Sequence, residues 1–285
     1  MILITGITGK TGGEVARQLS AADVPFRALV RNPEKAQALR PHGAELVMGD
    51  VGDPVALKRA LAGVSKALLV MPNGEHQLEL ESAFTDAAVA AGLKHLVKLS
   101  SLESVPESRN PITRMHVASE AHIRASGLAW TMIRPTFFTQ TFLAQAQRIR
   151  DRGEISMPVG KGTLAPTDLR DVAEIIVACL TQPGHEKQSY DLTGPELITM
   201  DEVAARFSQV LGKPVRFVDQ PLDEFRARLR AMNLTPWRVE AVVMELTAIA
   251  NGAIDHTTDT IRHLLGRPAT PLAQFIADHR AVFAA

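Results

Sequence analysis

Residues 1–12 read MILITGITGKTG, an apolar run followed by three glycines at a regular spacing. An apolar strand that runs into such glycines and then into a helix is typical of a dinucleotide-binding turn. The first glycine allows the tight turn, the second lets the backbone approach a pyrophosphate, and the third lets the helix pack closely on the strand. Free N–H groups at the start of the helix favour the phosphates. We therefore expect cofactor contacts from Gly6, Thr8, Gly9, Lys10, Thr11 and Gly12.

The segment Gly9–Thr11 also resembles the end of a P-loop, which binds nucleoside triphosphates. A P-loop needs an earlier glycine, at the position that Ile4 occupies here. The sequence therefore argues against a nucleoside triphosphatase.

Short apolar runs alternate with helical patterns over the first half of the chain. Strands are expected at residues 2–5, 26–30, 45–48, 67–71, 95–99 and 129–134, and helices at 13–21, 33–39, 54–62, 77–91 and 113–125. The apolar runs are continuous, as in strands buried on both faces of a parallel sheet. The alternation predicts an α/β fold, a Rossmann doubly wound parallel sheet, as a dinucleotide-binding domain over residues 1–150.

The pattern changes at about residue 150 and becomes mainly helical. Thr199 and Glu202 form a capping-box sequence, and Pro236 begins another helix. We expect residues 151–285 to form a small C-terminal lobe that closes a substrate cleft, with one or more segments returning to the sheet. Trp237 would lie either in the core of this lobe or in a pocket wall.

The end of the second predicted strand favours NADP(H) over NAD(H). Arg31 follows this strand, and no carboxylate stands there to hold the ribose of NAD. A guanidinium can bind the 2′-phosphate of NADP with two hydrogen bonds, and Lys35 adds a second positive charge. Asp50 and Val51 follow the next strand and are expected beside the adenine, although Asp50 could also be a solvated turn residue.

Bulk composition excludes several classes of function. The chain has 31 basic and 31 acidic residues, so no net charge recruits nucleic acid or an anionic membrane. Its only cysteine, Cys179, lies in an apolar stretch and is expected to be a buried thiol, which fits a reducing cytoplasm. We find no signal-peptide pattern, no apolar run near the roughly 20 residues of a membrane span, and no metal-binding spacing.

These residues resemble the NmrA-like family of atypical short-chain dehydrogenase/reductases. The family includes NADPH-dependent quinone oxidoreductases, triphenylmethane-dye reductases and cofactor-sensing regulators. The resemblance covers almost the whole chain. It rests on Thr5–Gly12, Gly49-Asp50 with Asp53, Ser100-Ser101, Gly127–Pro135, Thr167-Asp168, Asp171–Ala173 and Leu192–Pro195.

The resemblance implies further contacts. Met71, Pro72 and Asn73 would border the ribose next to the nicotinamide, and Pro135 would lie near the nicotinamide itself. Phe137 and Phe138 would wall the substrate pocket, although aromatic residues after a strand often only pack in the core.

Many members of the wider superfamily use a catalytic Tyr with a Lys four residues later on one helix, and this chain lacks the pair. The positions that we align with it hold His116 and Glu120. We expect Glu120 to orient the imidazole and raise its pKa, so that His116 donates a proton, or else the two form a local stabilising pair. Ser100, where the family has its catalytic Ser, would bond the nicotinamide or substrate, or cap a strand.

Three functions remain open at this point. The first is an NADPH-dependent oxidoreductase that acts on a quinone-like or other conjugated small molecule, for which positioning of donor and acceptor is the main requirement. The second is a non-catalytic NADP(H) sensor, and the third is a tailoring enzyme of specialised metabolism. Either a monomer or a homodimer fits the sequence.

Overall fold

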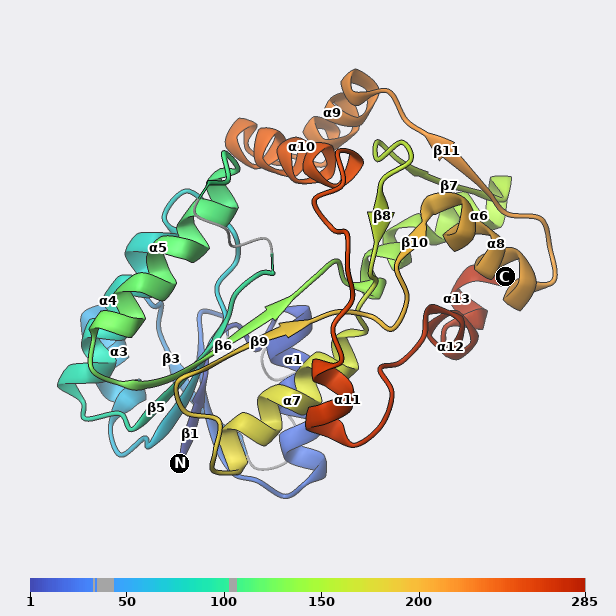
Figure 1. Ribbon diagram of the computed structural model, residues 1–285. Helices are drawn as coiled ribbons and strands as arrows, with labels where there is room; N and C mark the ends of the chain where they lie inside the picture. Colours follow the sequence, from blue (N-terminus) through green and yellow to red (C-terminus); the bar gives the residue numbers. More distant parts are fainter. Residues whose placement is uncertain (33, 35–43, 103–106, 285) are drawn as a thin grey trace. The chain divides into compact units, whose positions relative to one another are not determined.

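The computed structural model describes residues 1–32, 34, 44–102 and 107–284, which form two compact units (Figure 1). The first unit contains Met1–Arg134 and Val172–Asp191, and the second contains Pro135–Asp171 and Leu192–Ala285. The chain leaves the first unit after Arg134, earlier than the boundary expected at residue 150, and later returns to it for one helix and one strand. The expected helix at 33–39, with Lys35, lies outside the described residues.

The first unit is built on a seven-stranded sheet in the order β3-β2-β1-β4-β5-β6-β9. Its strands are β1 (Ile2–Ile4), β2 (Phe26–Val30), β3 (Ala44–Met48), β4 (Lys66–Leu69), β5 (His95–Leu99), β6 (Ala129–Pro135) and β9 (Gln188–Leu192). The first six pair in parallel. The strand order reverses at β1, which lies between β2 and β4, and this confirms the doubly wound Rossmann sheet.

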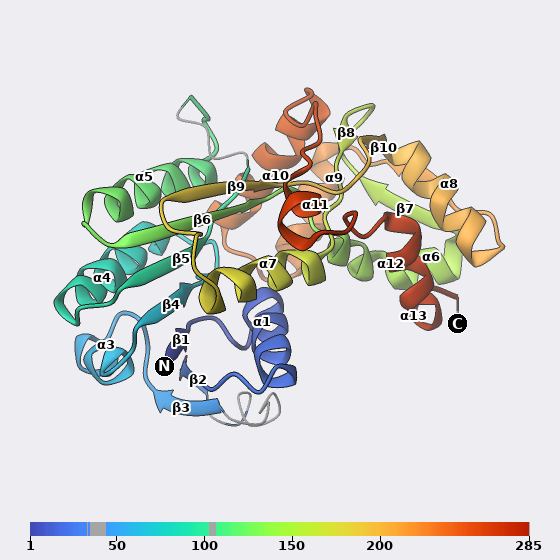
Figure 2. The same cartoon turned by 60° about the horizontal axis from the view of Figure 1, so that its bottom comes forward.

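Helices cover both faces of this sheet (Figures 1 and 2). They are α1 (Lys10–Ala21), α3 (Pro54–Leu61), α4 (Gln77–Ala90), α5 (Pro111–Ala125) and α7 (Leu169–Thr181). Helices α3, α4 and α5 share one face, where Leu57, Phe84 and Ile123 pack in one apolar core. Helix α3 begins as predicted. The Asp53 side chain accepts a hydrogen bond from the Val55 N–H, and Pro54 has no N–H that would be left without a partner in the first turn. Cys179 on α7 is fully buried, as expected, and burial raises the pKa of its thiol to about 12.

The second unit combines helices with two short two-stranded sheets. Its elements are η1 (Thr139–Gln145), α6 (Ala146–Arg152), β7 (Glu154–Met157), β8 (Thr163–Leu164), β10 (Ile198–Thr199), α8 (Met200–Leu211), β11 (Arg216–Asp219), α9 (Leu222–Ala231), α10 (Pro236–Ala250), α11 (Thr260–Leu265), α12 (Leu272–Asp278) and α13 (Arg280–Ala284). Strand β7 pairs with β11 in parallel, and β8 pairs with β10 antiparallel. The predicted capping box at the start of α8 is present in full.

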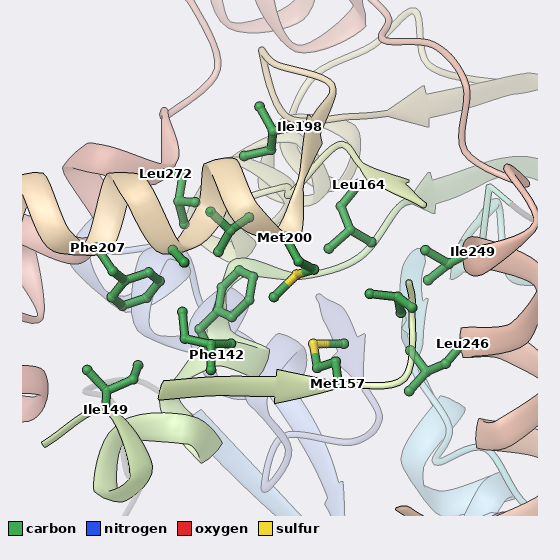
Figure 3. Packing of buried hydrophobic residues seen from close by; sticks show 14 of the residues in the cluster. Phe142, Ile149, Met157, Leu164, Ile198, Met200, Phe207, Leu246, Ile249 and Leu272 are labelled. Atoms are coloured by element: carbon green, nitrogen blue, oxygen red, sulfur yellow. The ribbon is translucent and has the colours of Figure 1, made fainter. Parts of the chain in front are cut away.

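An apolar core fills the second unit (Figure 3). Phe142 packs edge-on against Phe207, with ring centroids 5.7 Å apart. Met157, Met200 and Leu246 lie in the same core, so η1, β7, α8 and α10 share one buried centre. This unit therefore has an apolar core of its own.

Candidate active site

The glycine turn connects β1 to α1 and is fastened to the neighbouring strand. The Thr5 hydroxyl donates to the Val70 carbonyl at 3.0 Å and accepts from the Val70 N–H at 2.8 Å. Gly6 has a φ of +67°, which favours glycine. A Cβ at Gly12 would lie 2.4 Å from the Gly6 carbonyl oxygen, so helix and turn approach more closely than any side chain allows.

Helix α1 begins at Lys10, three residues earlier than predicted. Gly9 is its N-cap and offers no side chain to the first N–H groups. These N–H groups and the positive end of the helix dipole are therefore available to an anionic ligand. This arrangement suits a pyrophosphate.

A cavity of about 510 Å³ in the first unit opens beside this turn. Its walls come from the end of β2, from the residues that follow β1, β2, β3 and β4, and from Leu80 on α4, at the point where the strand order reverses. Seven residues predicted for cofactor binding line it, namely Gly6, Thr8, Arg31, Asp50, Val51, Met71 and Pro72. In doubly wound sheets, ligands bind at this switch point.

The other predicted cofactor residues do not line the cavity or lie outside the described residues. Gly9, Lys10, Thr11, Gly12 and Asn73 are not among the residues that line the cavity, and Pro135 belongs to the second unit. Thr5 and Ile7, which lie within the predicted turn but were not singled out, also line the cavity, as do six residues that were not predicted, namely Leu29, Val30, Asn32, Gly49, Val70 and Leu80. Asn32 and Gly49 adjoin the predicted residues Arg31 and Asp50, a signal that could have found them.

Two charged residues meet at the rim of the cavity. Arg31 Nε lies 3.5 Å from Asp50 Oδ2, and the side chains are 75% and 46% exposed. Asp50 Oδ1 also accepts a hydrogen bond from the Gly52 N–H at 2.8 Å. Asp50 is thus both a turn residue and a wall of the cavity, and it keeps the Arg31 guanidinium at the rim.

The expected pairing of Glu120 with His116 is wrong. Glu120 is buried and accepts hydrogen bonds from Ser100 Oγ at 2.6 Å and from both Nε and Nη2 of Arg134, with Arg124 Nη2 at 3.1 Å. Burial alone would raise the pKa of Glu120, but the bonds from Arg134 and Ser100 hold it below its ordinary value. Ser100 also donates its backbone N–H to the Ile133 carbonyl at 2.7 Å. This network ties β5, α5 and β6 together.

His116 instead faces a lysine and an amide. Its Nδ1 lies 3.1 Å from Lys98 Nζ and 3.4 Å from Gln77 Nε2. Burial, followed by the nearby Lys98 ammonium, lowers the pKa of His116 well below its ordinary value. The expected raised pKa is therefore also wrong, because the imidazole is buried and the charge beside it is positive.

The residues predicted for the substrate pocket belong to the second unit. Phe137 packs against Phe142 with ring centroids 5.4 Å apart, beside the apolar core. Phe138 forms a parallel bridge with Thr167, and Trp237 is half-buried in the first turn of α10. Their role as pocket walls stays a prediction.

Comparison with known proteins gives the family. The model of the NmrA-like family matches residues 1–272. The chain belongs to the NmrA-like family. It is 39% identical over 286 residues to an NAD(P)H azoreductase from Xenophilus azovorans, covering 100% of both chains.

Two solved reductases share the fold. The NADPH complex of the quinone oxidoreductase QOR2 from Escherichia coli has a TM-score of 0.87 and 29% identity, covering 98% of this chain and 99% of that one. The NADP(H) complex of triphenylmethane reductase from Citrobacter sp. gives the same TM-score, identity and coverage.

The described part of the chain has neither a membrane-spanning helix nor a cluster of metal ligands. None of the described helices is both long and apolar enough to cross a membrane. Residues 1–32, 34, 44–102 and 107–284 contain no group of three His, Cys, Asp or Glu side chains arranged to hold a metal ion.

Proposed function

We propose that this NmrA-like chain is an NAD(P)H-dependent oxidoreductase that transfers hydride to a quinone-like or other conjugated small molecule. The observation that carries the proposal is the cavity at the strand switch point, which joins the glycine turn to Arg31. The names of an azoreductase, a quinone oxidoreductase and a triphenylmethane reductase among the similar proteins support the same chemistry.

The residues present fit a dinucleotide. The close approach of Gly12 to Gly6 keeps the turn tight, and the N-terminus of α1 offers N–H groups to a pyrophosphate. Val51 gives the cavity an apolar wall for the adenine, and Met71 and Pro72 give it an apolar wall for the ribose next to the nicotinamide. When bound, the reduced nicotinamide supplies the hydride.

We further propose a preference for NADP(H). The Arg31 guanidinium lies at the rim of the cavity, where it can hydrogen-bond a 2′-phosphate, and among the described residues it is the Asp50 carboxylate that competes for it. Lys35, outside the described residues, is proposed to add to the positive charge. The same Asp50 carboxylate can accept from the ribose hydroxyl of NADH, so discrimination should be moderate.

Reduction of a conjugated acceptor makes small demands on the protein. A quinone or a cationic dye accepts hydride directly, so the chain has to bind the acceptor, orient it and exclude water. Glu120 is held by Arg134 and Ser100, and it has no proton to give at neutral pH because its pKa is lowered. We therefore assign Glu120 and Ser100 to holding the ends of β5 and β6 in place, as positioning residues.

The decisive experiment is turnover with a panel of acceptors. The purified chain is incubated with NADPH and a series of quinones, azo compounds and cationic triarylmethane dyes, and the nicotinamide absorbance is followed. We expect its loss with at least one class of acceptor. Calorimetry with NADPH runs in parallel. Tight binding without turnover of any acceptor would refute the oxidoreductase and leave a cofactor sensor, and absence of binding would refute both.

A further inference from the structure

A buried polar cluster lies beside the cavity and has no part in the function proposed so far. It consists of Gln77 and Glu81 on α4, Lys98 on β5 and His116 on α5, which we call the Lys98 cluster. Lys98 is 0% exposed, Gln77 and Glu81 are 1% exposed, and His116 is 6% exposed. Burying an ammonium group is costly unless every hydrogen on it finds an acceptor. The burial of Lys98 therefore needs an explanation.

The cluster lies immediately behind one wall of the cavity. Lys98 is the register partner of Leu69 at the end of β4, and the chain then runs through Val70 and Met71 along the cavity. On α4, Leu80 lines the cavity and Glu81 is the next residue. The Lys98 cluster therefore lies at the same carboxyl edge of the sheet as the glycine turn, with β4 between β1, which leads into the turn, and β5, which carries Lys98.

Every hydrogen of the Lys98 ammonium has an acceptor. Nζ donates to Glu81 Oε1 at 3.0 Å and to the Leu99 carbonyl oxygen at 3.2 Å, and it lies 3.1 Å from His116 Nδ1. The Gln77 amide nitrogen donates to Glu81 Oε1 at 3.2 Å and faces the same Nδ1 at 3.4 Å. An ammonium has donors only, so its geometry requires Nδ1 to be an acceptor.

The hydrogen of the neutral imidazole must then lie on the opposite nitrogen, Nε2. A hydrogen on Nδ1 would face the hydrogens of an ammonium and of an amide, with no acceptor between them. The lowered pKa of His116 agrees with an uncharged ring. Among the described residues, none hydrogen-bonds to Nε2.

We propose that Lys98, with Glu81 as its counter-ion, is a positioning residue that fixes His116 as the Nε2–H tautomer, and that this N–H donates a hydrogen bond to the electronegative atom of a carbonyl-type acceptor such as a quinone oxygen. The donor role rests on the proposed function, whereas the tautomer does not. Negative charge grows on the quinone oxygen as the ring accepts hydride, and a fixed donor stabilises that charge.

The imidazole keeps its proton throughout this step. The acceptor gains two electrons and one hydrogen as hydride from the reduced cofactor, which leaves oxidised, and it takes one proton from water. Proton loss from a neutral imidazole would leave an anion, and a proton passed on from Lys98 would leave Glu81 buried without its counter-ion. Hydrogen bonding without transfer avoids both.

The tautomer is tested by nitrogen NMR on the full chain labelled with ¹⁵N. The His116 signals are assigned from the His116→Gln variant. We expect a protonated Nε2 and an unprotonated Nδ1 at neutral pH, and a mixture of tautomers in the double variant Lys98→Met/Glu81→Gln, which removes both charges and leaves none buried alone. A hydrogen on Nδ1, a charged ring, or an unchanged spectrum in the double variant would overturn the assignment.

The donor role is tested by selectivity between two acceptors. A cationic triarylmethane dye accepts hydride at carbon and has no oxygen that gains charge, so it serves as the reference. For His116→Phe we expect the ratio of kcat/KM for quinone over dye to fall about 100-fold, mostly through kcat. His116→Gln, which restores an N–H donor, should recover part of it. Equal losses for both acceptors would overturn the donor role. If the wild-type chain turned over neither acceptor, both the donor role of His116 and the proposed function would be overturned. The nitrogen NMR spectrum tests the tautomer of His116 independently of turnover.

Discussion

Replacement of Arg31 by alanine should weaken the binding of NADPH and leave that of NADH nearly unchanged. The guanidinium lies at the rim of the cavity, 3.5 Å from the Asp50 carboxylate. The two cofactors differ only in the phosphate on the adenine ribose. The charge of Arg31 can therefore separate them only through that phosphate.

The magnitude follows from the exposure of the pair. Two unit charges 4 Å apart attract each other by about 1 kcal/mol in bulk water and by about 4 kcal/mol near a protein surface. Arg31 is 75% exposed and Asp50 already offsets part of its charge, so the lower end applies. We expect a loss of about 1–2 kcal/mol, or roughly 5–30-fold in Kd for NADPH.

Calorimetry with both cofactors, at low and at high salt, measures this effect. The loss should shrink at high salt, because exposed charges are screened. Arg17→Ala is the matched control, since Arg17 is 63% exposed and pairs with Glu14 on α1. Equal weakening of NADPH and NADH, or a loss in Arg17→Ala as large as in Arg31→Ala, would refute the assignment of Arg31 to the 2′-phosphate.

Three further outcomes can be measured. Gly12→Ala places a Cβ 2.4 Å from the Gly6 carbonyl oxygen, so the turn must open; we expect at least about a tenfold loss of NADPH affinity and a smaller cofactor-induced rise in Tm. Burial, followed by the charge of Lys66, lowers the pKa of His95 to about 4, so the unfolded chain takes up a proton at this residue before the folded chain does. The free energy of unfolding should therefore fall as the pH falls from 6.5 towards 4. In urea unfolding, His95→Gln should flatten this part of the pH profile, and the control His263→Gln, at an exposed position, should not. Thr199→Ala removes the capping box of α8 and should cost about 1 kcal/mol in urea unfolding, and an unchanged midpoint would contradict the role of the cap.

Much of the fold could be predicted because its decisive signals are local. The apolar runs of β1, β2 and β5 are continuous in sequence, and the caps at Asp53 and Thr199 act within one turn of helix. The path of the chain between the two units is different. It depends on which strand edge and helix face the later segments cover, and no short window of sequence contains that information.

In the candidate site, too, the features set by local sequence could be predicted and those set by distant contacts could not. The turn, Arg31 and Asp50 could be predicted because each directly follows a strand whose end lies at one edge of the sheet. The pairing of His116 with Glu120 failed because helical spacing gives only a shared face, and stronger partners came from β5 and β6. One signal was available, since a lysine inside the apolar run of β5 needs a buried acceptor.

The division of the chain into two interleaved units also affects the order in which the units can fold during synthesis. The last strand of the first sheet, β9, and most of α7 come from Val172–Asp191, after Pro135–Asp171 has already been laid down in the second unit. A growing polypeptide cannot complete its cofactor-binding half until the ribosome has passed Asp191. By then the opening segment of the other half is already outside. No single cut in the coding sequence separates the two units, because each unit is made of two separate stretches of the chain. Neither unit can therefore be transferred to another gene as one continuous segment.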